Sequence, residues 1–199
     1  MCGIFGIIGK SKNFSSEINK LINFASRRGK DSSGILTYKS FYKIYKADFD
    51  IKKLKKKLDL KNLNLIIGIG RLITNGNKDN QPLINSGSAI FHNGIIINEK
   101  KLFDLEKIKK FSDIDSEIIL SMANKYIQEY KIKNIANIIL EKCIGTNSAA
   151  LVFPKLGKLI LISNNGSLYY SILNKVTYFS SEFNHLKQLK CKNIKKLIN

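Results

Sequence analysis

Strand-like apolar runs stand at both ends of this sequence, and helical patterns lie between them. The first run covers residues 3–9 and ends in glycine, which is typical of a buried strand. Apolar residues at helical spacing predict helices over 115–130 and 133–143, and strand patterns return from residue 148 onward. This order predicts one α+β domain in which helices cover the sheets.

Shorter elements joined by polar turns fill the rest of the chain. A basic amphipathic pattern over 50–60 predicts a helix, which we interpret as a solvated helix covering a sheet edge. The basic tail, residues 187–199, is expected to fray from residue 190 onward. The other predicted elements are a helix at 16–27, strands at 35–38, 41–45, 63–70, 88–92, 148–153, 158–163, 168–173 and 176–180, and a last helix at 182–189.

Length and residue content exclude several classes of protein. The 199 residues fit a single domain, 1–199, and 44% of them are hydrophobic, which is enough for a packed core. No apolar run approaches the roughly 20 residues that span a bilayer, and the N-terminus lacks the basic region of a signal peptide. The three cysteines, Cys2, Cys143 and Cys191, are scattered and far from any histidine pair. They argue against a disulfide framework and a zinc site, and they fit a cytoplasmic location.

The chain is strongly basic, with 34 Lys and Arg against 15 Asp and Glu, a formal charge of +19. Lysine far outnumbers arginine, and Ile and Asn are also in excess, as an AT-biased genome would produce. Nucleic-acid readers usually interleave arginine and aromatic residues in a recognisable module, so the composition argues against a nucleic-acid partner. The excess lies mainly in 52–61 and 187–196, where docking of an acidic protein partner is the better hypothesis.

A cysteine follows the initiator methionine directly. Removal of Met1 would leave Cys2 with a free α-amino group, whose unperturbed pKa is about 7.7–8.0. Such a residue can supply both a thiol nucleophile and the general base that activates it. The structural alternative is a small buried residue at the start of a strand.

The tripeptide at 92–94, HNG, ends an apolar strand pattern. The side-chain amide of Asn93 and the backbone N–H of Gly94 can together form an oxyanion hole. The structural alternative is an ordinary Asn-Gly turn at the end of a strand.

Two charged residues fit recognition of an amino-acid head group. Arg71, with Thr74 close behind it, can bind a carboxylate, and Asp115 can hold an ammonium group. The structural alternatives are an arginine that merely follows a strand and an aspartate that caps a helix.

Seven segments, in order along the chain, resemble the glutaminase domain of class II glutamine amidotransferases, which are N-terminal-nucleophile hydrolases. The similarity is to the glutaminase domains of glucosamine-6-phosphate synthase and glutamine phosphoribosylpyrophosphate amidotransferase. The resemblance implies a four-layer αββα sandwich of antiparallel sheets. The matching segments are MCGIFGI (1–7), RRGKDSSGI (27–35), GIGRLITNG (68–76), NQPL (80–83), FHNGIIIN (91–98), SDIDSEIIL (112–120) and YFSSE (178–182).

The resemblance also implies roles for single residues. Cys2 would be the nucleophile, and Asn93 and Gly94 would form the oxyanion hole. Segment 72–81 would close over bound glutamine. The remaining implied roles are α-carboxylate binding for Arg71 and Thr74, α-amino binding for Asp115 with the Gly94 backbone, and support of the nucleophile by Arg28 and Asp31.

One position departs from the family pattern. Asn75 stands where members that use fructose 6-phosphate commonly have histidine. Asparagine can still donate a hydrogen bond to substrate but cannot titrate. The reaction needs no titrating group there, because the base would be the terminal amine of Cys2.

The implied reaction hydrolyses the side-chain amide of L-glutamine to glutamate and ammonia, without a metal or an organic cofactor. A chain of 199 residues leaves no segment for an ammonia-using domain, so we expect either a stand-alone glutaminase subunit with a separate synthase partner, which we favour, or a domain excised from a longer protein. One alternative is a catalytically silent module of the same fold that docks an acidic partner through its basic surface. Another is an N-terminal-nucleophile hydrolase that acts on a different amide.

Overall fold

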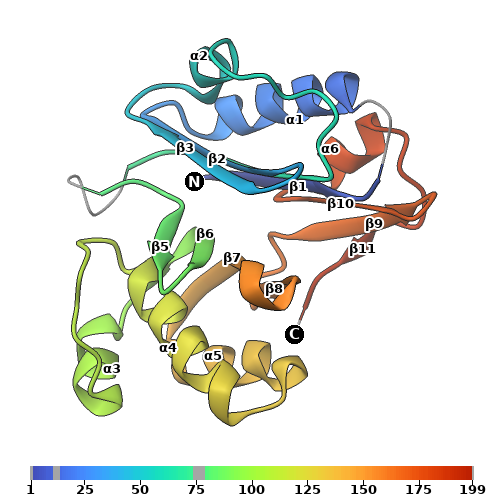
Figure 1. Cartoon of the computed structure of the whole chain (residues 1–199). Coiled ribbons are helices and arrows are strands. Elements are labelled where there is room, and N and C mark those ends of the chain that lie inside the picture. The colour runs from blue at the N-terminus through green and yellow to red at the C-terminus, as the bar shows by residue number, and fades with distance from the viewer. Residues whose placement is uncertain (1, 11–13, 74–78, 199) are drawn as a thin grey trace.

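The apolar runs pair into two antiparallel sheets that lie face to face, as the computed structural model shows for residues 2–10, 14–73 and 79–198 (Figure 1). The larger sheet has the strand order β11-β9-β10-β1-β4-β2-β3, and the smaller has the order β5-β6-β7-β8. The strands are β1 (Gly3–Ile8), β2 (Ser32–Tyr38), β3 (Tyr42–Ala47), β4 (Leu65–Arg71), β5 (Leu83–Asn85), β6 (Ser88–Ile96), β7 (Gly145–Phe153), β8 (Lys158–Ser163), β9 (Tyr169–Leu173), β10 (Val176–Ser180) and β11 (Lys195–Lys196).

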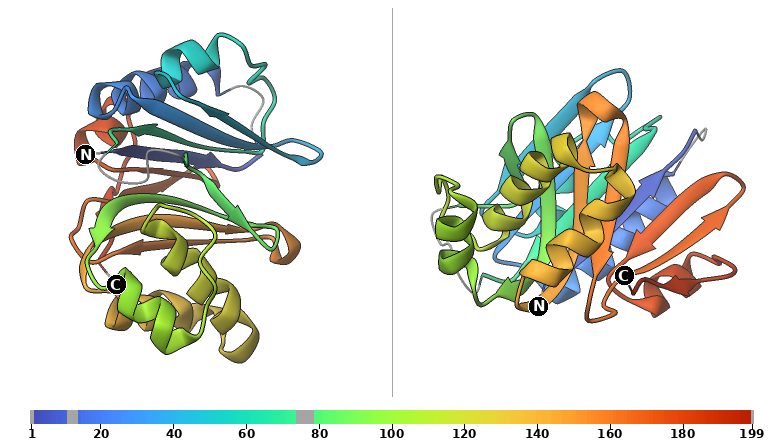
Figure 2. Two further views of the ribbon diagram at one scale, coloured as in Figure 1. Left: turned by 90° about the vertical axis from the view of Figure 1, so that its left-hand side faces the viewer. Right: turned by 90° about the horizontal axis from the view of Figure 1, so that it is seen from below.

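Helices cover the outer face of each sheet, which gives the four layers visible edge-on in Figure 2. Helices α1, α2 and α6 lie on the larger sheet, and α4 and α5 lie on the smaller one, with α3 packed against α4 (Figure 1). The predicted αββα sandwich of antiparallel sheets is therefore confirmed. The helices are α1 (Ser15–Arg28), α2 (Ile51–Lys55), α3 (Glu99–Glu106), α4 (Ser116–Glu129), α5 (Ile135–Lys142) and α6 (Phe183–Gln188).

Three apolar cores hold these layers together. Leu21 of α1 packs with Ile35 of β2 between the first helical layer and the larger sheet. Ile67 and Phe91 share the core between the two sheets. Ile118 belongs to the core between the smaller sheet and its helices. Because both faces of each sheet are covered, the central strands are apolar on both sides, which explains the continuous apolar runs in the sequence.

Several predicted elements differ from the structure in their extent. The helix predicted over 50–60 ends at Lys55, because only Ile51 and Leu54 of α2 are buried and the lysines around them repel one another. Helix α3 and the three-residue strand β5 were absent from the prediction. Part of the tail that we expected to fray is paired, since β11 lies beside β9 and the N–H of Leu197 donates to Leu168.

The longest described helices, α1 and α4, have 14 residues each. Within the described ranges, no helix combines the length and the hydrophobicity that a membrane span requires.

Candidate active site

Cys2 lies immediately before β1, at the edge of the space between the two sheets. It is buried, and its backbone nitrogen lies 2.9 Å from Oδ1 of Asn93 on the smaller sheet. Its Sγ lies 3.8 Å from the carbonyl oxygen of Leu72. Burial raises the pKa of the Cys2 thiol, although the Leu72 contact and the positive charge of Arg71 oppose this rise. The thiol therefore needs a base close to it in order to act as a nucleophile near neutral pH.

A cavity of about 190 Å³ opens beside the Cys2 thiol. Residues from both sheets line it, so the site exists only where the two sheets meet. The lining residues are Cys2, Leu72, Asn93, Gly94, Ile95, Thr146 and Asn165.

Asn93 and Gly94 lie inside β6, paired with Ser148 and Asn147 of β7, so the interpretation as an Asn-Gly turn is wrong. A Cβ atom at position 94 would collide with the carbonyl oxygen of Thr146, which leaves room only for glycine. Oδ1 of Asn93 accepts from the Cys2 nitrogen, so Nδ2 of the same amide can donate to a ligand. The strand thus brings two hydrogen-bond donors, the Asn93 amide and the Gly94 N–H, to the cavity that contains the thiol.

Asp115 stands at the start of α4, but its side chain does not cap the helix. Its Oδ2 accepts a hydrogen bond of 2.7 Å from the backbone N–H of Ile96, at the end of β6. The side chain is buried. The interpretation of Asp115 as a helix cap is therefore wrong. Its carboxylate instead binds the strand at Ile96, two positions after Gly94.

Arg71 is the last residue of β4 and is 2% exposed. Its Nη1 donates to the carbonyl oxygen of Asp79 over 2.7 Å. Burial lowers the pKa of Arg71, and the negative charges of Cys2 and Asp115 oppose this shift. Arg71 is thus linked by charge to Cys2 and to Asp115, although neither Arg71 nor Asp115 is among the residues that line the 190 Å³ cavity.

Arg28, the last residue of α1, and Asp31, just before β2, bind backbone groups next to the site. Nε of Arg28 donates to the carbonyl oxygen of Cys2 over 2.8 Å, and its guanidinium forms an ion pair with Glu182. Oδ2 of Asp31 accepts from the N–H of Ile73 over 2.9 Å, just after β4. Arg28 thus binds the backbone of the first matching segment, at Cys2, and Asp31 binds the backbone of the third, at Ile73.

Two residues expected in the site, Thr74 and Asn75, lie outside the described residues. Other residues belong to the site although the sequence did not predict them there. Glu182 stands in the segment YFSSE, yet its ion pair with Arg28 spans 154 positions and has no local signal. Thr146 lines the cavity because β7 lies beside β6, which only the sheet order reveals. Asn165 reaches the cavity from the turn after β8, where its Oδ1 accepts from Ser148 of β7.

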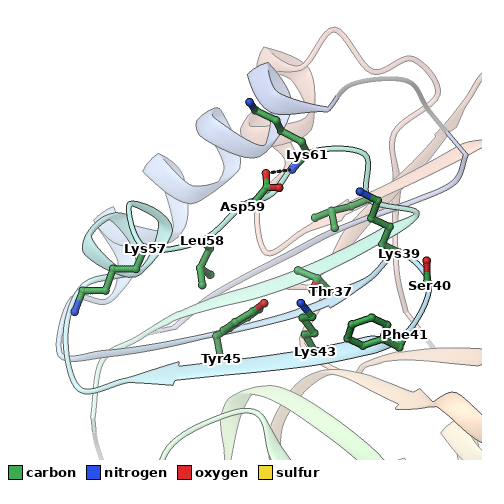
Figure 3. A pocket seen from close by; sticks show the side chains of 11 residues that line it. Thr37, Lys39, Ser40, Phe41, Lys43, Tyr45, Lys57, Leu58, Asp59 and Lys61 are labelled. Carbon is green, nitrogen blue, oxygen red and sulfur yellow. Dashed lines mark hydrogen bonds between the residues drawn. The ribbon is translucent and has the colours of Figure 1, made fainter.

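A second cavity, of about 340 Å³, contains none of the predicted site residues (Figure 3). Thr37 and Tyr45 rise into it from β2 and β3, and the segment after α2 forms its other wall (Figure 3). Four lysines surround it: Lys39, Lys43, Lys57 and Lys61.

Comparison with known proteins agrees with this geometry. Residues 70–188 match the model of a family described as a glutamine amidotransferase domain. The chain is 31% identical over 176 residues to a glutamine--fructose-6-phosphate aminotransferase [isomerizing] of Rhizobium leguminosarum bv. viciae, covering 83% of this chain and 29% of that protein. It is 36% identical over 135 residues to the protein of the same name from Chlamydia caviae, covering 61% and 22%. The chain thus spans less than a third of the length of these relatives.

The fold also matches a solved structure. A glutamine phosphoribosylpyrophosphate (PRPP) amidotransferase from B. subtilis, complexed with ADP and GMP, superposes with a TM-score of 0.78 at 18% identity. The match covers 99% of this chain and 45% of that one. Together with the N-terminal cysteine at the junction of two stacked sheets, the family match leads to one conclusion: this chain belongs to the glutamine amidotransferase domain family, in its class II, N-terminal-nucleophile branch.

Proposed function

We propose that this chain is a glutaminase component that hydrolyses the side-chain amide of L-glutamine to glutamate and ammonia. The observation that supports it most directly is the 2.9 Å contact between the Cys2 nitrogen and Asn93 Oδ1, beside a cavity that the thiol and Gly94 share. Removal of Met1 would turn this nitrogen into an amine held by Asn93 next to its own thiol. Nucleophile, base and oxyanion donors would then converge on one cavity.

The proposed reaction has two stages. The α-amine takes the thiol proton, and Cys2 Sγ bonds to the amide carbon of glutamine while negative charge on the oxygen is stabilised by Asn93 Nδ2 and Gly94 N–H. The C–N bond breaks as the protonated amine returns its proton to the leaving nitrogen, which releases ammonia and leaves a thioester. Water then attacks the thioester, which yields glutamate and restores the thiol.

Substrate recognition is proposed to depend on the charges around the thiol. Arg71 would hold the α-carboxylate of glutamine, together with Thr74 and Asn75. Asp115 would accept from the α-amino group, with help from the Gly94 carbonyl. The burial of Arg71 and Asp115 supports these roles, because charge-assisted hydrogen bonds are strongest where water is excluded.

The decisive experiment is labelling with 6-diazo-5-oxo-norleucine, a glutamine analogue that carries an electrophile. We expect one label, located on Cys2 by mass spectrometry, on protein that has lost Met1. Glutamine should block the label and asparagine should not, which separates glutamine from other amides. Cys2→Ala should abolish both labelling and glutamate release, whereas Cys191→Ala, the same change in a half-buried cysteine that does not line the cavity, should change neither.

Retention of Met1 would contradict the glutaminase proposal, because Cys2 would then have no terminal amine. The alternative of a silent docking module would be favoured instead.

We also propose that the ammonia acceptor is a separate synthase, which docks through the basic surface. The four lysines around the 340 Å³ cavity support an acidic partner, because opposite charges steer association (Figure 3). The complex should weaken steeply as salt concentration rises, since exposed charges are screened. A complex that is insensitive to salt would contradict this docking mode.

A further inference from the structure

The side chain of Gln81 occupies the place of a missing strand residue beside β6. In the β5–β6 ladder, Leu83 pairs with Ile90, so the same register would place residue 81 opposite His92. Strand β5 begins only at Leu83, yet the Gln81 carboxamide makes both hydrogen bonds that a strand residue would make. Its Nε2 donates to the His92 carbonyl over 3.0 Å, and its Oε1 accepts from the His92 N–H over 2.6 Å.

This contact lies directly before the proposed oxyanion hole. Alternate residues of a strand direct their backbone groups to the same side, so His92, Gly94 and Ile96 all face away from β7. Gln81 binds the backbone of His92, and Asp115 binds the N–H of Ile96. The N–H of Gly94, between them, faces away from β7 as well, and outside the sheet ladders of the described residues it donates to no backbone group. Two side chains thus fix the strand on either side of one open donor.

Gln81 is itself held against the larger sheet. Its N–H donates to Oδ1 of Asn80 over 2.7 Å, and Nδ2 of Asn80 donates to the Ala47 carbonyl over 2.9 Å. Its carbonyl oxygen packs so closely on Gly34 of β2 that a Cβ at that position would collide with it. The Gln81 side chain is 3% exposed. It therefore joins the sheet that carries Cys2 to the strand that carries Asn93.

We propose that Gln81 is a positioning residue for the oxyanion hole: its carboxamide replaces β5 beside His92, so that the backbone N–H of Gly94 stays available to donate to the substrate. This inference rests on the proposed glutaminase activity. Gln81 touches no reacting atom, so its contribution should be seen in kcat rather than in the affinity for glutamine.

The test compares Gln81→Leu, which removes both hydrogen bonds at similar size, with a matched control. Asn124→Leu serves as the control, because Nδ2 of Asn124 donates to the Asn85 carbonyl at the far end of the same hairpin. For Gln81→Leu we expect kcat to fall about 10- to 100-fold, as for a catalytic group displaced by up to about 1 Å. The KM for glutamine should change less than about threefold. Alkylation of Cys2 by iodoacetamide, which needs no oxyanion donor, should keep its wild-type rate.

Gln81→Glu supplies a readout that a purely structural role would not change. A carboxylate cannot donate to the His92 carbonyl, but a protonated carboxyl group can. The kcat of this variant relative to wild type should therefore rise as pH falls. The same ratio for Gln81→Leu should stay flat.

Three results would overturn the inference: a Gln81→Leu kcat within twofold of wild type, an equal loss of kcat in Asn124→Leu, or a Gln81→Glu ratio that is independent of pH. If wild-type protein releases no glutamate, the proposed function fails instead. The contact of the Gln81 side chain with the His92 backbone is then tested by hydrogen exchange. Gln81→Leu must speed exchange of the His92 amide by at least about tenfold. Unchanged exchange would overturn the proposed positioning role of Gln81 as well.

Discussion

The substitution Gly94→Ala tests how closely β6 must fit its neighbour for catalysis. The new Cβ would collide with the Thr146 carbonyl oxygen and lie 2.6 Å from Nε2 of His92. Neither group can move alone, because the first is backbone of β7 and the second belongs to a buried ring bonded to Ser116. Since carbon–oxygen contacts settle near about 3.3–3.6 Å, β6 must move away from β7 by more than about 1 Å. A displacement of that size costs about 100-fold in kcat, or roughly 2.7 kcal/mol of transition-state stabilisation.

The assay is steady-state glutamate release, read together with thermal unfolding. Overpacking should also lower the free energy of unfolding by about 1–3 kcal/mol, so a control of similar stability is needed. Gly87→Ala provides it at the other end of β6, where φ is +80° and the nearest atom to a new Cβ is 3.7 Å away. That change strains the backbone by about 1–2 kcal/mol but leaves the cavity unaltered, so kcat should stay within twofold of wild type. A Gly94→Ala enzyme with nearly full kcat would refute the assignment of an oxyanion donor to this residue.

Three further predictions concern charge. Glutaminase kcat/KM should rise with pH through about 7.7–8.0, because the terminal amine of Cys2 acts as a base only when neutral; a profile that is flat there would count against this base. Arg71→Lys should raise the KM for glutamine about 10- to 100-fold through loss of a bidentate contact, and an unchanged KM would exclude carboxylate binding by Arg71. Burial opposes ionisation of Glu106, but hydrogen bonds led by that from Lys125, with Lys142 also contributing, lower its pKa from 4.5 to about 2. A lowered carboxyl pKa stabilises the fold above pH 4.5, and the half-exposed lysines reduce this gain. Glu106→Gln should therefore cost about 1–2 kcal/mol in chemical denaturation at pH 7, and the difference should shrink as pH falls and vanish only below about pH 2.

Residues with a strong local pattern were predicted well from the sequence. Strands β8 and β10 occupy the predicted ranges, because apolar residues between turn residues define them without help from other elements. Strand β5 was missed because three residues carry no periodicity, and α3 was missed because only Leu102, Phe103 and Glu106 of it are buried.

The site divides in the same way. The sequence motifs assign Cys2 and Asn93 to one site, but they do not predict the contact between them. The contact of Asp115 with Ile96 could not be predicted, because local sequence favours a helix cap at that position and only the docking of α4 on β6 decides otherwise. Gln81 belongs to a matching segment and to the end of segment 72–81, which is expected to close over glutamine. Its contact with His92 could not be predicted, because the β5–β6 register sets this partner rather than any residue beside Gln81.

The chain enters and leaves the smaller sheet once, so that β1–β4 and β9–β11 build one sheet while β5–β8 build the other. The thiol comes from the outer portions of the sequence, and the proposed oxyanion donors, Asn93 and Gly94, come from the middle. Any event that slides one sheet over the other therefore changes the distance between sulfur and donor without touching either residue. A partner that binds on either helical face, far from the cavity, would therefore change the proposed glutaminase activity if its binding shifted one sheet against the other.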